Sequence, residues 1–262
     1  MIIYKNITYQ YMPEGPEIRK MVKSVQKYKN ARLKDIKILS GRYIRHGKPK
    51  LFNKFRGILP LKIVKIANKG KFVWLELDKG WSIWISMAMT GNFSSQRNDY
   101  SRFEFNTSKG IFYLNDTRNF ASVIFCHNDE LLKKKLASLG PDLLQSNPSV
   151  NYLCERIKKS KSNKDISTFL LDQSVLSGVG NYIRADSLYL AKISPFRKIH
   201  SLNSSDCRRL QKMIQKVMVI NYKSKNKYKK FYVYHRDHTD KGEKINHKMY
   251  KGRTIYWATT QR

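Results

Sequence analysis

The chain has 262 residues, of which 41% are hydrophobic, so it can bury a sizeable core and is not a disordered polypeptide. Lys and Arg number 52 against 19 Asp and Glu, which gives a formal net charge of +33. A field of this sign attracts polyanions and indicates a nucleic-acid ligand, although a ribosomal-type or merely adhesive basic surface has the same charge. The chain contains no run of about 18 apolar residues, so we expect no membrane partner.

Three cysteines, Cys126, Cys154 and Cys207, lie far apart and form no CxxC pair. Such spacing is untypical of a disulfide scaffold or a thiolate zinc site, and it fits a reducing compartment. Residues 1–11 lack both the long apolar core of a signal peptide and the Arg and Ser content of a transit peptide. Their pattern assigns them no role.

The first predicted helix follows Pro13. Apolar residues at positions 18, 21, 22 and 25 have the spacing of a helix face, and Pro16 suits a first turn because the N–H that proline lacks would have no partner there. Stretches rich in β-branched and aromatic residues follow, separated by glycines, at residues 62–66, 72–77, 81–87, 102–105 and 111–114. This spacing is typical of an antiparallel sandwich or barrel.

The second half of the chain changes character. A helical pattern at residues 129–138 ends the first half, and further helical patterns occur at residues 150–159, 166–172, 181–191 and 205–220. A sequence pattern typical of β-strands occurs again around Gly242 and Gly252. We therefore predict an α+β protein of two domains, with an N-terminal helix and antiparallel β-sandwich over residues 12–138, a linker at 139–150, a helical domain at 151–228 and a β-hairpin at 229–262.

Pro13 is the first candidate for chemistry. If translation begins at Met12 and the initiator is removed, the nitrogen of Pro13 becomes a free secondary amine. A terminal amine has a pKa of about 8 against about 10.4 for lysine, so more of it is unprotonated at neutral pH. Such an amine condenses with a sugar aldehyde to an iminium ion, which draws electrons and promotes the loss of phosphate. The alternative is a proline that only begins a helix.

Two carboxylates accompany Pro13. Glu14 and Glu17 lie three residues apart near the start of the predicted helix. One is expected to protonate the sugar ring oxygen and to move protons during base loss, and the other to hold the substrate or orient a water. The alternative is that acidic residues favour the positive end of a helix dipole, which explains Glu17 better than Glu14.

Residues 12–19, Met-Pro-Glu-Gly-Pro-Glu-Ile-Arg, resemble the start of endonuclease VIII. From here the chain resembles the formamidopyrimidine-DNA glycosylase/endonuclease VIII family along nearly its whole length. The resemblance implies that Pro13 is the Schiff-base nucleophile and Glu14 its acid partner. Residues 70–77, Gly-Lys-Phe-Val-Trp-Leu-Glu-Leu, are similar to the family's strand whose lysine, here Lys71, belongs to the catalytic site and binds phosphate beside the lesion.

Two further segments resemble the family's gap-filling loops. Residues 86–91, Ser-Met-Ala-Met-Thr-Gly, resemble its HLGMSG segment, and Met89 takes the place of the methionine that fills the void left by the flipped base. Residues 116–120, Asp-Thr-Arg-Asn-Phe, resemble its DPRRF segment. This likeness implies that Arg118 contacts the orphaned base and that Phe120 wedges into the base stack.

Residues 171–185 resemble the helix–two-turn–helix signature, in which the asparagine of the GVGN stretch, here Asn181, contacts DNA phosphate. Gly178 and Gly180 are predicted to let the backbone approach DNA closely, and the helix that begins at Asn181 offers unpaired N–H groups to an anion. Residues 252–256, Gly-Arg-Thr-Ile-Tyr, resemble the second strand of the family's C-terminal finger. This likeness implies that the arginine of that strand, here Arg253, binds phosphate across the lesion.

The resemblance implies a bifunctional DNA glycosylase and AP lyase of base excision repair that cleaves the strand by β,δ-elimination. We expect a monomer without a cofactor, acting inside the cell on damaged double-stranded DNA, with single-stranded DNA and the compartment left open. Gly15 and Ser167 replace a leucine and a phosphate-binding lysine of the purine-directed branch, which favours oxidised pyrimidines. The alternatives are a scaffold directed at 8-oxoguanine and formamidopyrimidines, and a non-catalytic DNA-binding protein.

Two features depart from the family's pattern. The finger lacks the usual four cysteines, so we predict a zincless finger held by aromatic packing, with no metal. A zinc site built from His235, His238 and His247 is the alternative, although their spacing matches no standard zinc pattern. Because an amide-bonded Pro13 cannot form an iminium ion, we expect residues 1–11 to be absent from the mature protein.

Overall fold

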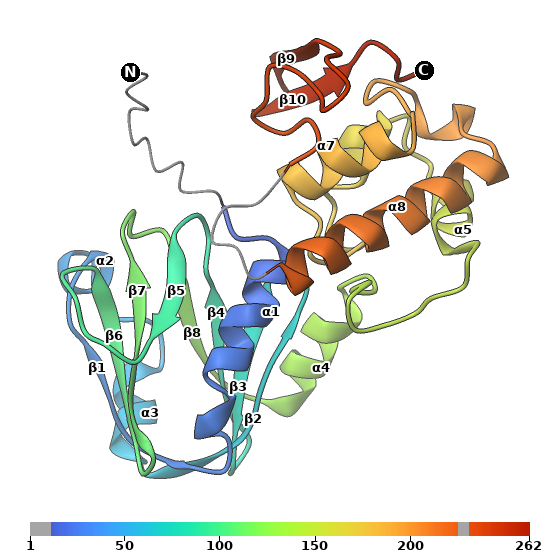
Figure 1. Cartoon of the computed structure of the whole chain (residues 1–262). Coiled ribbons are helices and arrows are strands. Elements are labelled where there is room, and N and C mark those ends of the chain that lie inside the picture. The colour runs from blue at the N-terminus through green and yellow to red at the C-terminus, as the bar shows by residue number, and fades with distance from the viewer. Residues whose placement is uncertain (1–11, 225–230) are drawn as a thin grey trace, which may run out of the picture. The chain divides into compact units, whose positions relative to one another are not determined.

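The protein is described by a computed structural model that covers residues 12–224 and 231–262 (Figure 1). The predicted N-terminal extension, residues 1–11, lies outside the described residues. Within them the chain forms two compact units. Unit 1 contains residues 12–13, Met21–Asn68 and Phe72–Leu132, and unit 2 contains Glu14–Lys20, Lys69–Lys71 and Lys133–Arg262. The sequence pattern placed the domain junction after residue 138, whereas the chain enters the main part of unit 2 at Lys133.

Unit 1 is built on an eight-stranded sheet with the order β5-β7-β6-β1-β2-β3-β4-β8. Its two halves pack as a sandwich, and β1 joins β2 through the antiparallel pairs Arg32↔Lys62 and Leu33↔Leu61. The strands are β1 (Arg32–Ile38), β2 (Leu61–Lys69), β3 (Phe72–Leu77), β4 (Trp81–Ser86), β5 (Gly91–Ser94), β6 (Ser101–Thr107), β7 (Gly110–Asp116) and β8 (Ser122–His127). The short helices α2 (Arg42–Arg45) and α3 (Phe52–Gly57) lie between β1 and β2 in sequence.

Aromatic rings fill the interior of the sandwich. Phe105 and Phe112 stack with their centroids 4.6 Å apart, and Phe55 packs against Trp81 at 5.2 Å and Phe125 at 4.9 Å. All five side chains are at most 2% exposed. Burial of this aromatic surface stabilises unit 1.

Sequence patterning predicted five of these strands and missed β1, β5 and β8. In β1 the buried residues Leu33 and Ile36 are three apart, because the pairing with β6 shifts register between Leu33 and Asp35 and breaks the alternation. In β8 the exposed Ile124 lies between the buried Val123 and Phe125, so the apolar run hides the period of two. β5 has only four residues, too few to show a pattern.

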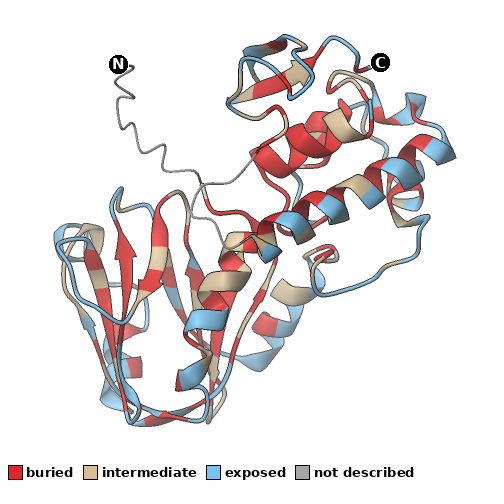
Figure 2. Ribbon diagram, in the orientation of Figure 1, coloured by how far each residue is buried: buried red, intermediate tan, exposed pale blue. Residues whose placement is uncertain are grey.

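Unit 2 is helical and ends in a hairpin. Its elements are α5 (Tyr152–Lys158), α6 (Ile166–Phe169), α7 (Asn181–Leu190), α8 (Ser204–Lys223), β9 (Ile245–Tyr250) and β10 (Arg253–Ala258). The helix α1 (Gly15–Ser24) begins in unit 2, and α4 (Asp129–Ala137) ends in it. Figure 2 shows that α7 is buried along most of its length, whereas exposed and buried residues alternate on α8.

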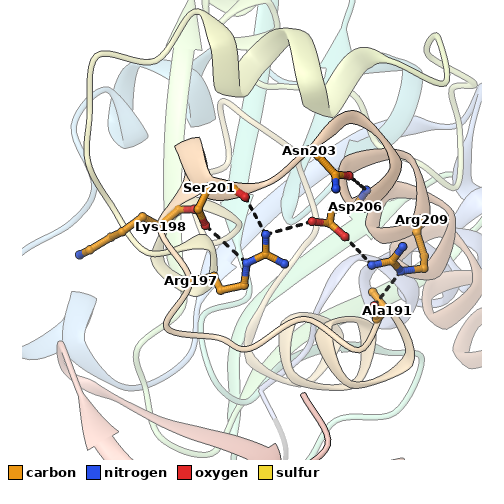
Figure 3. Close-up of polar contacts among 7 residues, drawn as sticks. All are labelled: Ala191, Arg197, Lys198, Ser201, Asn203, Asp206 and Arg209. Carbon is orange, nitrogen blue, oxygen red and sulfur yellow. Dashed lines mark hydrogen bonds and ion pairs between the residues drawn. The ribbon is translucent and has the colours of Figure 1, made fainter. Parts of the chain in front are cut away.

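An ion-pair cluster holds the start of α8 to the end of α7 (Figure 3). The Asp206 carboxylate accepts hydrogen bonds from Arg209 at 2.5 Å and from Arg197 at 3.0 Å. Arg209 also donates to the carbonyl oxygen of Ala191, the residue that follows α7. The Asn203 side chain caps α8 by accepting from the Asp206 N–H. These contacts fix the C-terminal end of α7, the helix that organises the candidate site.

The β9–β10 hairpin is held to the helices by packing and by two buried carboxylates. Tyr256 and Ile245 pack against Ala185 of α7, and Asp186 accepts hydrogen bonds from the N–H groups of Val233 and Tyr234. The second carboxylate is that of Asp165, the residue before α6, which accepts hydrogen bonds from Tyr250 and Lys251 at the turn of the hairpin. In the described part of the chain, no three His, Cys, Asp or Glu side chains form a group that could hold a metal. His235 instead lies within hydrogen-bond distance of the Tyr256 hydroxyl.

Candidate active site

The centre of the candidate site is Glu14, at the N-terminus of α7. Its carboxylate is 2% exposed and accepts hydrogen bonds from the N–H groups of Gly180 at 2.8 Å, Tyr182 at 2.9 Å and Ile183 at 3.2 Å. Three donors at the positive end of a helix stabilise the negative charge of this carboxylate. The sequence predicted that this helix end binds an anion. In the structure the Glu14 carboxylate occupies this helix end, and the binding of DNA phosphate by Asn181 stays a prediction.

Glu17 makes a second set of contacts in unit 2, with the backbone of Glu14 and with Tyr182. Its carboxylate accepts from the Glu14 N–H at 3.0 Å, as the third residue of a capping box does. The Tyr182 hydroxyl lies 3.2 Å from both Glu17 carboxylate oxygens. Burial of Tyr182, together with the nearby charges of Glu17 and Glu14, raises the pKa of its phenol well above the ordinary value. Glu17 therefore lies in the first turn of α1, where the dipole alternative expects an acidic residue, and it also caps the helix. Its catalytic role stays a prediction.

Lys71 lies beside Glu14, across a space that Gly180 keeps open. A methyl group added to Gly180 would lie 2.5 Å from the Lys71 Nζ atom and would overlap the Glu14 carboxyl. Burial lowers the pKa of the Lys71 ammonium group; the Glu14 carboxylate opposes this shift and the Arg253 guanidinium adds to it. The structure thus brings together three predicted site residues, Glu14, Lys71 and Gly180, in unit 2.

Three glycines meet next to this centre. The Gly15 N–H donates to the Gly178 carbonyl oxygen at 2.9 Å, and a Cβ atom on Gly178 would lie 3.2 Å from the Cα atoms of Gly15 and Gly70. Gly178 has φ +96°, a value that side chains disfavour. The close backbone approach predicted for Gly178 is therefore an approach to protein, while its contact with DNA stays a prediction. Gly15 likewise has a packing reason, since a Cβ atom there would lie 3.0 Å from Met218.

Asn181 and Arg253 come together through the hairpin. The Asn181 Nδ2 atom donates at 3.0 Å to the carbonyl oxygen of Thr254, the residue after Arg253. Arg253 itself is exposed. Buried beneath them lies Arg184, which donates to Asn181 Oδ1 and, at 3.3 Å, to the same Thr254 oxygen. Burial lowers the pKa of Arg184 to about 10; Glu14 opposes this shift and Arg253 adds to it. The Arg253 guanidinium therefore acts electrostatically on both Lys71 and Arg184 in unit 2.

The predicted gap-filling residues lie in unit 1, on two loops of the sandwich. Met89 lies between β4 and β5 and is partly buried, whereas Arg118 and Phe120 lie exposed in the turn between β7 and β8. The guanidinium of Arg118 lies 5.0 Å from the centroid of the Phe120 ring. Such a pair offers a cation and an exposed aromatic face on one turn.

The two loops are joined by hydrogen bonds that the sequence did not predict. The Thr90 hydroxyl accepts from the Arg118 N–H at 2.9 Å and donates to the buried Asp116 carboxylate. The other oxygen of Asp116 accepts from the Ala121 N–H at 2.6 Å. Met89 therefore precedes a residue that is bonded directly to the turn of Arg118.

Two sequence-predicted positions have simple local surroundings. Pro13 is buried and directly precedes Glu14. Ser167, which replaces the expected lysine, is fully buried in α6, and its hydroxyl has no hydrogen-bond partner among the described residues. In this structure it cannot reach a phosphate on the surface.

Comparison with known proteins decides the family. Residues 12–123 match the formamidopyrimidine-DNA glycosylase N-terminal domain, and residues 139–230 match the formamidopyrimidine-DNA glycosylase H2TH domain. A formamidopyrimidine-DNA glycosylase of Ureaplasma parvum is 31% identical over 248 residues, which cover 89% of this chain and 87% of that protein. The chain belongs to the formamidopyrimidine-DNA glycosylase family.

Solved structures show the same fold. A Lactococcus lactis formamidopyrimidine-DNA glycosylase bound to DNA with an AP site is 21% identical and superposes with a TM-score of 0.81, covering 95% of this chain and 99% of the other. The Thermus thermophilus MutM protein is 20% identical, with a TM-score of 0.81 over 95% of this chain and 98% of the other. The predicted fold is confirmed: a β-sandwich, a helical domain with the helix–two-turn–helix and a C-terminal hairpin.

Family membership makes the chain a bifunctional DNA glycosylase and AP lyase of base excision repair, which confirms the predicted enzyme class. Within residues 12–224 and 231–262, no helix is both long and apolar enough to cross a membrane. Sequence reasoning missed Arg184 and Tyr182 as members of the candidate site. Both lie within the matched signature at residues 171–185, so their place on the site helix was the signal available.

Proposed function

We propose that this glycosylase excises oxidised bases from damaged double-stranded DNA and then cuts the strand through a Schiff base on Pro13. The observation that supports this most is the Glu14 carboxylate, fixed by three N–H groups of α7 immediately after Pro13 in the chain. Those donors favour the ionised carboxylate, so Glu14 begins the reaction as a proton acceptor. Lys71, held beside it, supplies positive charge for a phosphate next to the lesion.

The chemistry follows from these groups. The nitrogen of Pro13 attacks C1′ of the flipped nucleotide and the base departs. Glu14 accepts the proton of the amine and passes it to the ring oxygen of the sugar. Ring opening gives an iminium ion between Pro13 and C1′. Loss of a C2′ proton then expels the 3′ phosphate, and a second elimination expels the 5′ phosphate. The electron pairs released in both steps flow toward the iminium nitrogen, which is why a covalent amine is needed.

This chemistry requires an unacylated nitrogen on Pro13. We therefore propose that the active polypeptide starts at Met12 and loses that methionine, so that residues 1–11 are not part of it. Intact-mass measurement of active protein from its native source tests this. A mass that includes residues 1–11 in enzyme that cuts damaged DNA contradicts the proposal.

We further propose how the duplex is held. Asn181, Arg253 and Lys71 bind phosphates, while Met89, Arg118 and Phe120 occupy the gap left by the flipped base. Flipping costs a few kcal/mol of unstacking, and contacts of the inserted side chains offset part of it. The exposure of Arg118 and Phe120, together with their mutual contact, supports this assignment.

For the lesion class we propose oxidised pyrimidines, because residues 12–19 resemble the start of endonuclease VIII. Lesions of the formamidopyrimidine type are the second candidate, since the matched relatives carry that name and Gly15 has a packing role of its own. Competition between duplexes with 5-hydroxyuracil, thymine glycol, 8-oxoguanine and a formamidopyrimidine decides between them. Preference for the two purine lesions contradicts the first proposal and supports the second.

Strand cutting by protein produced from Met12 tests the activity. We expect cleavage of a lesion duplex on both sides of the sugar, and loss of cleavage in the Pro13→Gly and Glu14→Gln variants. Tight, salt-dependent DNA binding without any cutting supports the non-catalytic alternative instead.

A further inference from the structure

The orientation of the Asn181 side-chain amide is fixed from two sides. The Arg184 guanidinium carries only donors, so the amide atom that it contacts must be the oxygen. The Thr254 carbonyl only accepts, so the atom 3.0 Å from it must be the nitrogen. An amide nitrogen carries two hydrogens, and Thr254 engages one of them. The second is the donor we assign to a DNA phosphate.

Arg184 is the residue that makes this arrangement specific. It lies three residues after Asn181, so both side chains share one face of α7. Its side chain is only 2% exposed, which leaves it inside unit 2 and away from a bound duplex. Its guanidinium also donates to the Thr254 oxygen at 3.3 Å, directly beside the Arg253 residue that starts β10. One buried cation therefore contacts both the site helix and the hairpin.

We propose that Arg184 is a positioning residue that holds Asn181 and the Arg253 strand as one phosphate-binding unit. Its guanidinium keeps the Asn181 oxygen turned inward, so that the amide nitrogen faces outward, and it fixes the carbonyl that follows Arg253. Without it, the Thr254 carbonyl alone holds the amide. The amide then turns over more readily, and in the turned orientation it presents its oxygen to the phosphate, which is repulsive. This inference rests on the proposed function, in which Asn181 and Arg253 bind phosphate.

A double-mutant cycle tests the inference. Affinity is measured for a duplex with a tetrahydrofuran abasic analogue, using the parent protein, Arg184→Met, Asn181→Ala and the double variant. Since a hydrogen bond to a charged group contributes about 1.5–3 kcal/mol, we expect each single variant to bind about 10-fold or more weakly. In the Asn181→Ala background, Arg184→Met should weaken binding much less, because the residue through which it acts is already gone.

Arg209→Met is the matched control. Arg209 is another arginine that bridges two segments of unit 2, yet its partners are Ala191 and Asp206 rather than Asn181. Its effect on binding should therefore be the same with and without Asn181. If Arg184→Met does not fold, Arg184→Lys keeps the buried charge near Glu14 and is taken through the same cycle.

The possible outcomes separate this inference from the function on which it rests. If Asn181→Ala binds the abasic duplex as tightly as the parent, the phosphate role of Asn181 in the proposed function is wrong. If Asn181→Ala binds weakly but the Arg184 substitution costs the same factor in both backgrounds, the function stands and the positioning role is refuted. Coupling confined to the Arg184–Asn181 pair supports the inference.

Discussion

Gly180 offers the sharpest structural test of the site. Its backbone has φ −132° and ψ −155°, an extended conformation with negative φ that does not require glycine, so Gly180→Ala acts mainly through the added methyl group. That methyl group would overlap the Glu14 carboxyl and lie 2.5 Å from the Lys71 Nζ atom. The Glu14 side chain must then leave its position, and it loses part of its hydrogen bonding to α7.

The size of the effect follows from this geometry. Relief of the overlap requires a movement on the order of 1 Å, and a misplacement of that size costs about 100-fold in rate. Forcing a methyl group into a packed interior also lowers the free energy of unfolding by about 1–3 kcal/mol. We therefore expect a variant that folds, with a reduced midpoint of thermal unfolding and about 100-fold lower single-turnover cleavage of an abasic duplex.

Gly57→Ala provides the control, because a Cβ atom on Gly57 meets no atom within 4 Å. That variant should cut the abasic duplex at the parental rate. The reasoning is refuted if the cleavage rate of Gly180→Ala lies within twofold of the parental rate. Catalysis would then not depend on the position of the Glu14 carboxylate seen in the structure.

Three further predictions concern the loops and the buried carboxylates. Thr90→Val should weaken binding of the abasic duplex severalfold while Thr90→Ser retains it, because the Thr90 hydroxyl bonds the Met89 loop to the Arg118 turn. Equal affinities of the two variants would contradict this link. Asp165 is buried beside the hairpin turn and accepts hydrogen bonds from Tyr250, Lys251 and Lys198. Desolvation alone would raise the pKa of this carboxyl, but the three hydrogen bonds outweigh it and lower the pKa from 3.8 to about 2. Its contribution to stability is therefore present above pH 3.8 and lost as the pH falls toward 2, and urea unfolding of Asp165→Asn should lack that part of the acid sensitivity. Burial raises the pKa of Asp186 from 3.8 to about 6, so its stabilising effect should fade as the pH rises through that window. If the urea midpoints of Asp186→Asn follow the same pH profile as those of the parent, Asp186 is not the group that causes this loss of stability.

Local signals in the sequence were enough for most elements of the fold. α7 was predicted from its signature and β3 from its β-branched and aromatic run, and both begin where expected. β1 was missed because its bulge removes the alternation on which strand prediction depends. A bulge depends on the partner strand, β6, which lies far along the chain.

The site was only half visible in the sequence. Glu14 and Gly180 could be singled out by resemblance, but the hydrogen bond between them joins residues 166 positions apart. No local pattern shows that the anion at α7 is a side chain of the protein itself. Gly180 was predicted to let the backbone approach DNA, and that contact stays a prediction. The structure adds that its missing side chain leaves room for Glu14 and Lys71. Arg184 was overlooked because a buried arginine looks like any other basic residue in a chain with 52 of them.

The central claim is a bond between the nitrogen of Pro13 and the sugar. Reducing the reaction of active protein and an abasic duplex with borohydride, followed by peptide mass spectrometry, locates that bond. We predict that the deoxyribose mass is carried by a peptide whose first residue is Pro13. An adduct on Lys71 or another lysine, or cleavage by a polypeptide that still has residues attached ahead of Pro13, would contradict the account.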